Sequence, residues 1–406
     1  MITGLSLSNF RAYNETKIEL APITVFTGGN NSGKSSIMYS LMILKNIVSN
    51  PNQGLDNFFS FGFLNLGGFK ENVFLKQEDT RQIELGIESS HESMESQYGI
   101  SLGKKKSKFW VKTRKPLSIS LALETGFPYA LNLPVGQDIS GEFGEAKITW
   151  NGLSPTVTLV KLNTPEEERA RIVQEITSAL IVCLEDIRRI DFISLKRGFT
   201  KPIYSPVSLP PNLFLEDEVA TLLANDRDLE GQVSYYLQKI VGRSFNFRPT
   251  SPGVASFYLQ TQDRQTSFIS DLVNEGFGTN QLVYLLTKCL RQNNSTICIE
   301  EPEIHLHPEA VARLVDSLCE ITADQRKTFL ISTHSEHFLL SLLNRVAQER
   351  IDPKNIRAYY IHKDKKESKS EKQEINRKGQ IEGGLKAFYD TQMREVQEYL
   401  DASQEK

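Results

Sequence analysis

The sequence has 406 residues, enough to form one large elaborated core or two modules. It contains 47 lysines and arginines against 50 aspartates and glutamates, and the net charge of −3 argues against a general attraction to nucleic acids or acidic membranes. The four cysteines are far apart with no C-x-x-C pair, no signal peptide opens the chain, and no run of about 18 apolar residues occurs. We therefore expect a soluble, cytoplasmic protein with reduced thiols and no membrane contact.

A glycine-rich turn lies between an apolar segment and an amphipathic one near the start of the chain. Residues 22–27 are short, apolar and β-branched, as in a buried strand, and after Ser35 the apolar residues recur at helical spacing. The intervening sequence GGNNSGKSS fits G-x-x-x-x-G-K-[ST], whose backbone N–H groups surround phosphates. Lys34 would reach the β- and γ-phosphates, and the Ser35 hydroxyl would bind Mg²⁺. The predicted nucleotide-binding residues here are Gly28, Asn30, Asn31, Ser32, Gly33, Lys34, Ser35 and Ser36.

The middle of the chain predicts two kinds of inserted structure. Residues 81–160 contain short apolar runs separated by polar turns, which predicts an antiparallel β-lobe. Two later segments, 164–189 and 215–241, have helical periodicity, and the lack of sustained heptads excludes a long coiled-coil arm. We expect one composite head with three parts, residues 1–160, 161–265 and 266–406.

Two charged stretches in these regions have simple interpretations. Residues 104–115, KKKSKFWVKTRK, have seven basic residues with two aromatic ones between them. They could contact a nucleic-acid backbone, but we favour a solvated hairpin with an exposed edge. Residues 363–374, KDKKESKSEKQE, mix both signs of charge with serine and predict a flexible, solvated loop.

The second half of the predicted site lies in residues 296–309, TICIEEPEIHLHPE. An apolar strand there ends on two carboxylates, and ligands of parallel sheets bind beyond the carboxyl ends of the strands. We assign Glu300 to Mg²⁺ and Glu301 to the attacking water. A further apolar strand in residues 328–337 ends at His334, whose imidazole would contact the γ-phosphate or that water. The alternative is a capped strand end with the imidazole satisfied by the backbone.

Five segments occur in the order found in ABC-type ATPase heads of the SMC/RecF/OLD clade: NFRAYN, GGNNSGKSS, NEGFGTNQLV, IEEPEIHLHP and ISTHS. More narrowly, the chain resembles compact OLD-like ATPases (overcoming lysogenization defect), several of which serve in anti-phage defence. The closing segment, residues 375–400, also resembles that subgroup. The resemblance implies an α/β ABC-type P-loop head with a mixed sheet, an antiparallel β-lobe and an inserted helical lobe.

The resemblance also implies roles for single residues. Arg11 corresponds to an N-terminal arginine that touches the nucleotide, Glu300 stands in place of the Walker B aspartate, Glu301 is the catalytic glutamate and His334 is the switch histidine. Leu306 and His307 fall in the D-loop. No convincing Q-loop glutamine is present, and Gln77 is only a weak candidate.

The signature segment falls on residues 274–282, where the usual serine is missing. The resemblance then leaves the contact with the γ-phosphate to Thr279, Asn280 or backbone N–H groups. Our candidate signature residues are Gly276, Gly278 and Asn280. Because the signature of one subunit completes the site of another in such heads, the resemblance implies a homodimer or higher homo-oligomer that ATP holds together.

Several functions remain open at this point. Full-length OLD proteins have a C-terminal Toprim nuclease, but the residues after His334 contain no D-x-D, and the one D-x-D, Asp226 to Asp228, falls in the predicted helical lobe. We therefore expect an ATPase that is not itself a nuclease and that controls a separate effector, as in anti-phage defence modules. The main alternative is a RecF-like DNA-binding repair ATPase. A transporter subunit and a scaffold without turnover are less favoured, and so is a metal cluster of Glu303, His305, His307 and His334.

Overall fold

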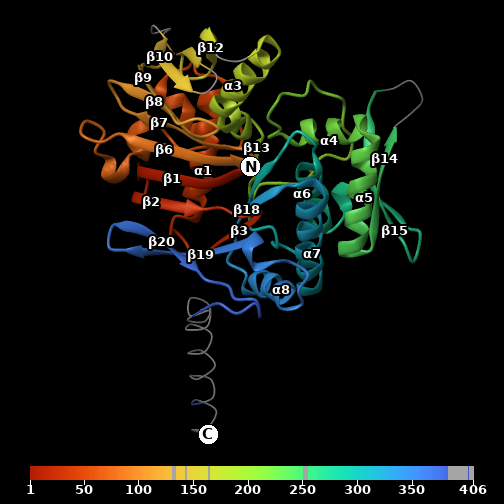
Figure 1. Ribbon diagram of the computed structural model, residues 1–406. Helices are drawn as coiled ribbons and strands as arrows, with labels where there is room; N and C mark the ends of the chain where they lie inside the picture. Colours follow the sequence, from red (N-terminus) through yellow and green to blue (C-terminus); the bar gives the residue numbers. More distant parts are fainter. Residues whose placement is uncertain (130–133, 142–143, 163–164, 250–254, 383–400, 402–406) are drawn as a thin grey trace.

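The computed structural model describes residues 1–129, 134–141, 144–162, 165–249, 255–382 and 401. A central sheet has the strand order β13-β17-β18-β3-β19-β20 (Figure 1). All neighbours in it are parallel except β20, which runs antiparallel to β19. Its strands are β3 (Ile23–Thr27), β13 (Ile190–Ile193), β17 (Thr296–Glu300), β18 (Thr328–Ser332), β19 (Ile356–Asp364) and β20 (Glu367–Gln373). Strands β3, β17 and β18 are buried at every position, as expected for parallel strands covered on both faces.

A second, antiparallel sheet has the order β2-β1-β6-β7-β8-β9. Its strands are β1 (Ile2–Phe10), β2 (Tyr13–Glu19), β6 (Ile83–His91), β7 (Met94–Leu102), β8 (Ser107–Lys115) and β9 (Ile119–Thr125). Helix α1 (Lys34–Ser49) contacts β1 and β6 of this sheet and β13 and β18 of the central sheet. Because α1 is buried on nearly every side, its start, where the glycine-rich loop ends, is held firmly between the two sheets.

The rest of the β-lobe lies next to β9 of the antiparallel sheet, and α3 packs on β6, β7 and β8 beside α1 (Figure 1). The lobe contains β10 (Val135–Gly141), β11 (Gly144–Trp150) and β12 (Pro155–Leu162), followed by α3 (Glu166–Arg188). Short elements β4 (Ser60–Phe61), β5 (Leu64–Asn65) and α2 (Phe69–Asn72) follow α1. The predicted antiparallel β-lobe is thus confirmed.

The opposite face of the central sheet is covered by helices, which form a second hydrophobic core with it. They are α4 (Glu216–Asn225), α5 (Arg227–Val241), α6 (Phe277–Leu290), α7 (Pro308–Gln325) and α8 (Glu336–Ala347). The helical lobe was predicted, but its small sheet of β14 (Arg243–Pro249), β15 (Phe257–Asp263) and β16 (Ile269–Asp271) was largely missed. Asp226 of the D-x-D caps α5 by accepting a hydrogen bond from Leu229 N. The α/β head fold is confirmed, and its division into three parts stays a prediction.

The prediction of a flexible loop at residues 363–374 was wrong, because this stretch forms most of the β19–β20 hairpin. Its small serines alternate with charged residues, so the strand period is present but little apolar surface reveals it. Ser368 is fully buried and its N donates to Ala12 O. Of the closing segment, residues 383–400 lie outside the described residues.

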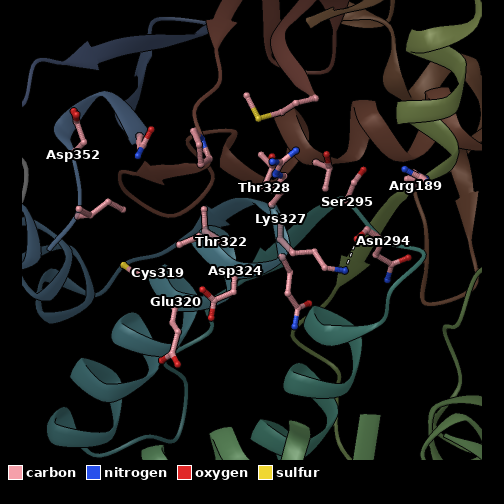
Figure 2. Close-up of a pocket in the computed structure, with 18 of the residues that line it drawn as sticks. Arg189, Asn294, Ser295, Cys319, Glu320, Thr322, Asp324, Lys327, Thr328 and Asp352 are labelled. Atoms are coloured by element: carbon pink, nitrogen blue, oxygen red, sulfur yellow. Dashed lines mark hydrogen bonds between the residues drawn. The ribbon is translucent and has the colours of Figure 1, made fainter. Parts of the chain in front are cut away.

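Two cavities lie at opposite ends of the central sheet. One, of about 840 Å³, lies at the carboxyl ends of the parallel strands, where Ser332 and Glu300 end β18 and β17. The other, of about 1160 Å³, lies at the amino ends, where Thr296 and Thr328 begin the same strands (Figure 2). In the part of the chain that the structure describes, no helix is long and apolar enough to cross a membrane.

Candidate functional site

The cavity at the carboxyl ends of the strands brings most of the predicted site residues together. Parallel strands deliver their following loops to one edge of the sheet, so segments from both ends of the chain meet there. The predicted residues that line this cavity are Arg11, Asn30, Asn31, Ser32, Gly33, Lys34, Ser35, Ser36, Glu300, Glu301 and His334. Gly28 lies in the same loop, directly after β3.

The glycine-rich loop needs glycine at two positions for steric reasons. Gly28 and Gly33 have φ values of 138° and 112°. A Cβ at Gly28 would lie 2.0 Å from Ile361 O, and one at Gly33 would lie 2.9 Å from Ser368 Oγ. The Ser368 hydroxyl also donates to Ser32 O at 2.5 Å. The β19–β20 hairpin therefore packs directly against the outside of the loop and helps to hold its curved backbone in place.

Lys34 lies at the centre of the loop with its ammonium group turned inward. Its Nζ donates to Gly28 O and Gly29 O, each at 3.0 Å, and lies 2.9 Å from His334 Nε2. Burial lowers the pKa of Lys34, and the nearby Glu301 carboxylate opposes that shift. Burial and the charge of Lys34 lower the pKa of His334. The imidazole is therefore neutral at pH 7, and its Nε2 accepts the hydrogen bond from Lys34.

The two predicted carboxylates occupy different environments at the end of β17. Glu300 is only 5% exposed, and its Oε1 accepts a hydrogen bond from the Tyr39 hydroxyl at 2.9 Å. Glu301 has a left-handed backbone with φ 41°, and its Oε2 accepts from His334 N at 3.0 Å. Glu300 and Ser35 line the same cavity. A carboxylate and a hydroxyl beside a phosphate-binding loop fit Mg²⁺, which takes few protein oxygens and completes its shell with phosphates and water.

Two further side chains at this end of the sheet, Tyr39 and Arg197, escaped the sequence analysis, and Glu303 was considered there only as a metal ligand. Tyr39 stands one turn into α1 and binds Glu300. Arg197 follows β13 and donates to the main-chain oxygens of Glu300 and Glu301 at 2.6 and 2.5 Å. Glu303 accepts a hydrogen bond from the Thr333 hydroxyl, and burial raises its pKa. Glu303 is a third acid in the run that contains Glu300 and Glu301, whereas no motif in the sequence marks Arg197.

Positive charge around the cavity is greater than the motifs predicted. Arg11 lines it, with Nη1 donating to Asn72 Oδ1 at 3.2 Å, and burial lowers its pKa. Lys76, Lys363 and Lys366 line it as well. These lysines come from segments without a recognisable nucleotide motif, so only the folded chain shows that they face the same space as the loop.

The signature residues do not line this cavity. Gly276 and Gly278 lie at the start of α6, and a Cβ at Gly278 would lie 2.6 Å from His305 O. Asn280 is 7% exposed: its Oδ1 accepts from Phe199 N at 2.7 Å, and its Nδ2 donates to Phe199 O and Leu272 O. All polar atoms of this side chain are engaged inside the chain, so the geometry does not support Asn280 as a phosphate ligand.

Two weaker expectations are also resolved by the geometry. Gln77 Oε1 accepts a hydrogen bond from Arg81 Nε at 2.6 Å, and Gln77 does not line the cavity. His307 caps α7 through Nδ1. Within the described ranges, no group of three histidine, cysteine, aspartate or glutamate side chains could hold a metal ion, so the less favoured cluster around His305 has no support.

Comparisons with known proteins agree with this site. Residues 1–127 match a family model described as an AAA ATPase domain, and residues 184–341 match one described as an AAA domain, putative AbiEii toxin, Type IV TA system. The first match contains the glycine-rich loop, and the second contains Glu300, Glu301 and His334. No curated protein matches the sequence.

Among solved structures, an SMC head bound to the C-winged helix domain of ScpA has a TM-score of 0.52 and 11% identity, over 92% of this chain and 98% of that one. An SMC head from Pyrococcus furiosus, bound to the C-terminal domain of ScpA, has a TM-score of 0.50 and 10% identity, over 98% and 99%. The chain has the fold of an SMC-type P-loop ATPase head. Together with the family models, this P-loop ATPase fold supports ATP binding and hydrolysis.

Proposed function

We propose that this protein is a Mg²⁺-dependent ATPase that changes its assembly state with bound nucleotide and thereby controls a separate effector protein. The proposal rests on one observation: the signature segment lies apart from the nucleotide cavity of its own chain. The phosphate loop, Glu301 and His334 line one cavity, whereas Gly276 and Gly278 lie outside it at the exposed start of α6. Phe277, between those glycines, is 75% exposed. A second copy could place this segment over the nucleotide and so complete the site.

The residues of the cavity have distinct roles in this proposal. The loop N–H groups and Lys34 bind the β- and γ-phosphates, while Ser35 and Glu300 hold Mg²⁺, which would neutralise phosphate charge. Glu301 orients the attacking water and accepts its proton. His334, neutral at pH 7, hydrogen-bonds the water or the γ-phosphate. Lys34 and His334 already contact one another at 2.9 Å, so a γ-phosphate bound by Lys34 would lie within reach of both.

The effector part of the proposal has support from the comparisons with known proteins. Both solved heads are bound to domains of ScpA, so partner proteins dock on heads of this fold. The family model for residues 184–341 is described with a toxin–antitoxin system, and the motifs resemble those of OLD-like defence ATPases. We therefore place the switch in anti-phage defence, with ATP binding favouring the closed homo-oligomer.

The basic stretch at residues 104–115 supports this choice over a RecF-like DNA-binding ATPase. Three of its lysines form ion pairs: Lys104 with Glu78 and Asp79, Lys106 with Glu124, and Lys115 with Glu95. Phe109 is fully buried in the core. The stretch mostly forms β8, an inner strand of the sheet and not the exposed edge that we expected. Its charge is therefore partly neutralised by carboxylates of the same chain.

The deciding experiment is native mass spectrometry of the Glu301→Gln variant purified from its host, with and without Mg–ATP. The proposal predicts a nucleotide-dependent homodimer or larger ring that carries a second protein. A complex with DNA and no protein partner would favour the RecF-like alternative. A monomer under both conditions would contradict the assembly part of the proposal.

A further inference from the structure

A short segment after β13, residues 194–199, joins the candidate catalytic carboxylates to the start of α6. At one end, Arg197 donates to the main-chain oxygens of Glu300 and Glu301 and also to Ser194 O. Its burial lowers its pKa to about 10, so the guanidinium stays charged at neutral pH. Glu301 has a φ of 41°, an unfavourable conformation for a residue other than glycine that persists only where its surroundings hold it. The Arg197 hydrogen bond to Glu301 O is part of that support.

At the other end, the segment is bound to the signature helix by one side chain. Asn280 of α6 both accepts from Phe199 N, at 2.7 Å, and donates to Phe199 O, at 2.9 Å. The amide supplies the acceptor and the donor that these two bonds need, whereas an ionised carboxylate would supply only acceptors. Gly198, which stands between Arg197 and Phe199 in the sequence, has φ 120°, and a Cβ there would lie 2.7 Å from Asn280 Oδ1. The helix and the segment are therefore in close contact, with no room for a side chain between them.

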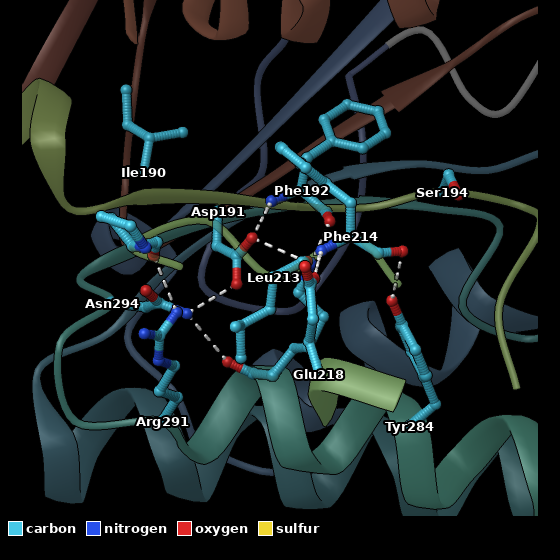
Figure 3. A network of polar contacts seen from close by, with 12 residues as sticks. Ile190, Asp191, Phe192, Ser194, Leu213, Phe214, Glu218, Tyr284, Arg291 and Asn294 are labelled. Carbon is cyan, nitrogen blue, oxygen red and sulfur yellow. Dashed lines mark hydrogen bonds and ion pairs between the residues drawn. The ribbon is translucent and has the colours of Figure 1, made fainter. Parts of the chain in front are cut away.

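The far end of α6 is anchored separately (Figure 3). Lys288, 1% exposed, forms an ion pair with Asp191 of β13 at 2.9 Å and donates to Phe192 O and Leu213 O at 2.7 Å each. Asp191 also accepts from Asn294 Nδ2 at 2.7 Å. Breaking a buried pair by moving one partner away is strongly unfavourable, so this end of α6 stays on β13. A displacement of α6 would then be concentrated at its signature end.

We propose that residues 194–199 relay the position of the signature end of α6 to Glu301 of the same chain, with Arg197 as a positioning residue. The inference rests on the proposed function, because a partner's nucleotide would be what displaces the signature. The path is Asn280, Phe199, Arg197 and the main chain of Glu301, and each step is a hydrogen bond or a covalent link. Nucleotide bound in the partner's site would in this way adjust how Glu301 of this chain positions the attacking water.

Steady-state kinetics of Arg197→Ala and Asn280→Asp test the relay. Asn280→Asp keeps the shape and the acceptor, and its ionised carboxylate has no donor for Phe199 O. We expect kcat to fall by about 100-fold for Arg197→Ala, the scale of a misplaced catalytic group, with ATP affinity unchanged within about twofold. The double variant should be no slower than Arg197→Ala, because both changes interrupt one path. Independent, multiplying losses or an unchanged kcat would overturn the proposal.

A matched control separates positioning from folding. Arg291 also donates to a main-chain oxygen, Pro211 O at 3.1 Å, but does not contact residues 300–301. Arg291→Ala should keep kcat. Arg197→Lys, which retains the charge and loses the forked geometry, should recover part of the rate at an unchanged Tm. If Arg197→Ala instead lowers Tm and ATP affinity together with kcat, and Arg197→Lys recovers no rate, Arg197 is structural and the proposal fails.

The relay and the proposed assembly can fail separately. If Glu301→Gln stays monomeric with Mg–ATP, the assembly part of the proposal is wrong. Basal ATP hydrolysis by the wild-type protein and by Arg197→Ala, which both keep Glu301, still reports whether Arg197 positions Glu301. If the dimer forms but Asn280→Asp hydrolyses ATP at the wild-type rate, the relay is wrong and the switch stands.

Discussion

The two ends of the central sheet each border a large cavity, and the smaller of the two has the features of a nucleotide site. At the carboxyl ends, α1 presents its N-terminus at Lys34, and Lys34, Arg11 and three more lysines line about 840 Å³. At the amino ends, α7 presents its C-terminus at Gln325 to about 1160 Å³. A helix N-terminus attracts anions and a C-terminus repels them, so the direction of the chain decides which cavity suits phosphate.

The charged side chains that line the two cavities also favour phosphate binding in the smaller one. In the larger one, Arg345 and Arg350 both bind Asp316, and Lys327 Nζ donates to main-chain oxygens of Arg291 and Asn294. Glu320 and Asp324 of α7 line it as well (Figure 2), and Glu320 forms an ion pair with Lys239 of α5. Aspartate and glutamate outnumber lysine and arginine among the residues that line the larger cavity, whereas lysine and arginine outnumber them in the smaller one. The comparison shows that the balance of charge and the direction of the helices identify a phosphate site better than volume does.

The largest expected effect comes from removing the central cation of the smaller cavity. Lys34→Ala should weaken ATP binding by about 100-fold or more, because charge-assisted hydrogen bonds to two phosphates are lost. Isothermal titration calorimetry with Mg–ATP measures this loss. Arg350→Ala, a cation of the larger cavity that is 55% exposed, is the matched control and should leave ATP affinity unchanged. Retained micromolar affinity in Lys34→Ala would contradict the phosphate-loop interpretation.

Replacing the Glu301 carboxylate by an amide tests the catalytic chemistry of the smaller cavity. Glu301→Gln should lower kcat by about 100- to 10,000-fold, the usual contribution of a general base, while ATP still binds. The amide can still accept from His334 N, so the main chain should keep its conformation. A phosphate-release assay measures the rate, with Glu320→Gln in the larger cavity as the control. Equal rates in Glu301→Gln and wild type would indicate a scaffold without the proposed catalysis.

Removal of the Tyr39 hydroxyl sharpens the metal assignment. The hydroxyl donates to Glu300 Oε1, so Tyr39→Phe should let the carboxylate reorient and weaken the apparent Mg²⁺ affinity by about tenfold. ATPase rates over a Mg²⁺ titration measure this shift. Tyr235→Phe, whose ring is half exposed on α5, is a control far from the loop. An unchanged Mg²⁺ dependence would count against Glu300 as the metal ligand.

The smallest expected effect concerns the hairpin behind the loop. Ser368→Ala removes the hydrogen bond to Ser32 O and should cost about 1 kcal/mol, seen as a rise of a fewfold in KM for ATP. Ser370→Ala, in the same strand but bonded to Thr16, should leave KM unchanged. Equal KM values for both variants and the wild type would show that the hairpin covers the loop without holding it.

Much of the fold and the site could be predicted from local patterns. The loop at residues 28–36 is contiguous, and the strand that ends at Glu300 has an apolar centre, Ile297 to Ile299, so neighbouring residues reveal both. Strand β20 was missed because Ser368, its one buried residue, gives almost no apolar signal. Arg197 was missed because its partners are main-chain oxygens, which every residue has and no motif can mark.

The sequence by itself determined the chemistry that this protein carries: a phosphate loop, two carboxylates and a histidine at strand ends, each within a short stretch whose spacing has a physical reason. The tertiary structure alone decided how these groups are supported and separated. It placed the signature segment outside the chain's own cavity, engaged Asn280 within the chain, and brought Arg197 to the main chain of Glu301. Such contacts join residues far apart in sequence, and their geometry exists only after the two sheets have packed around α1.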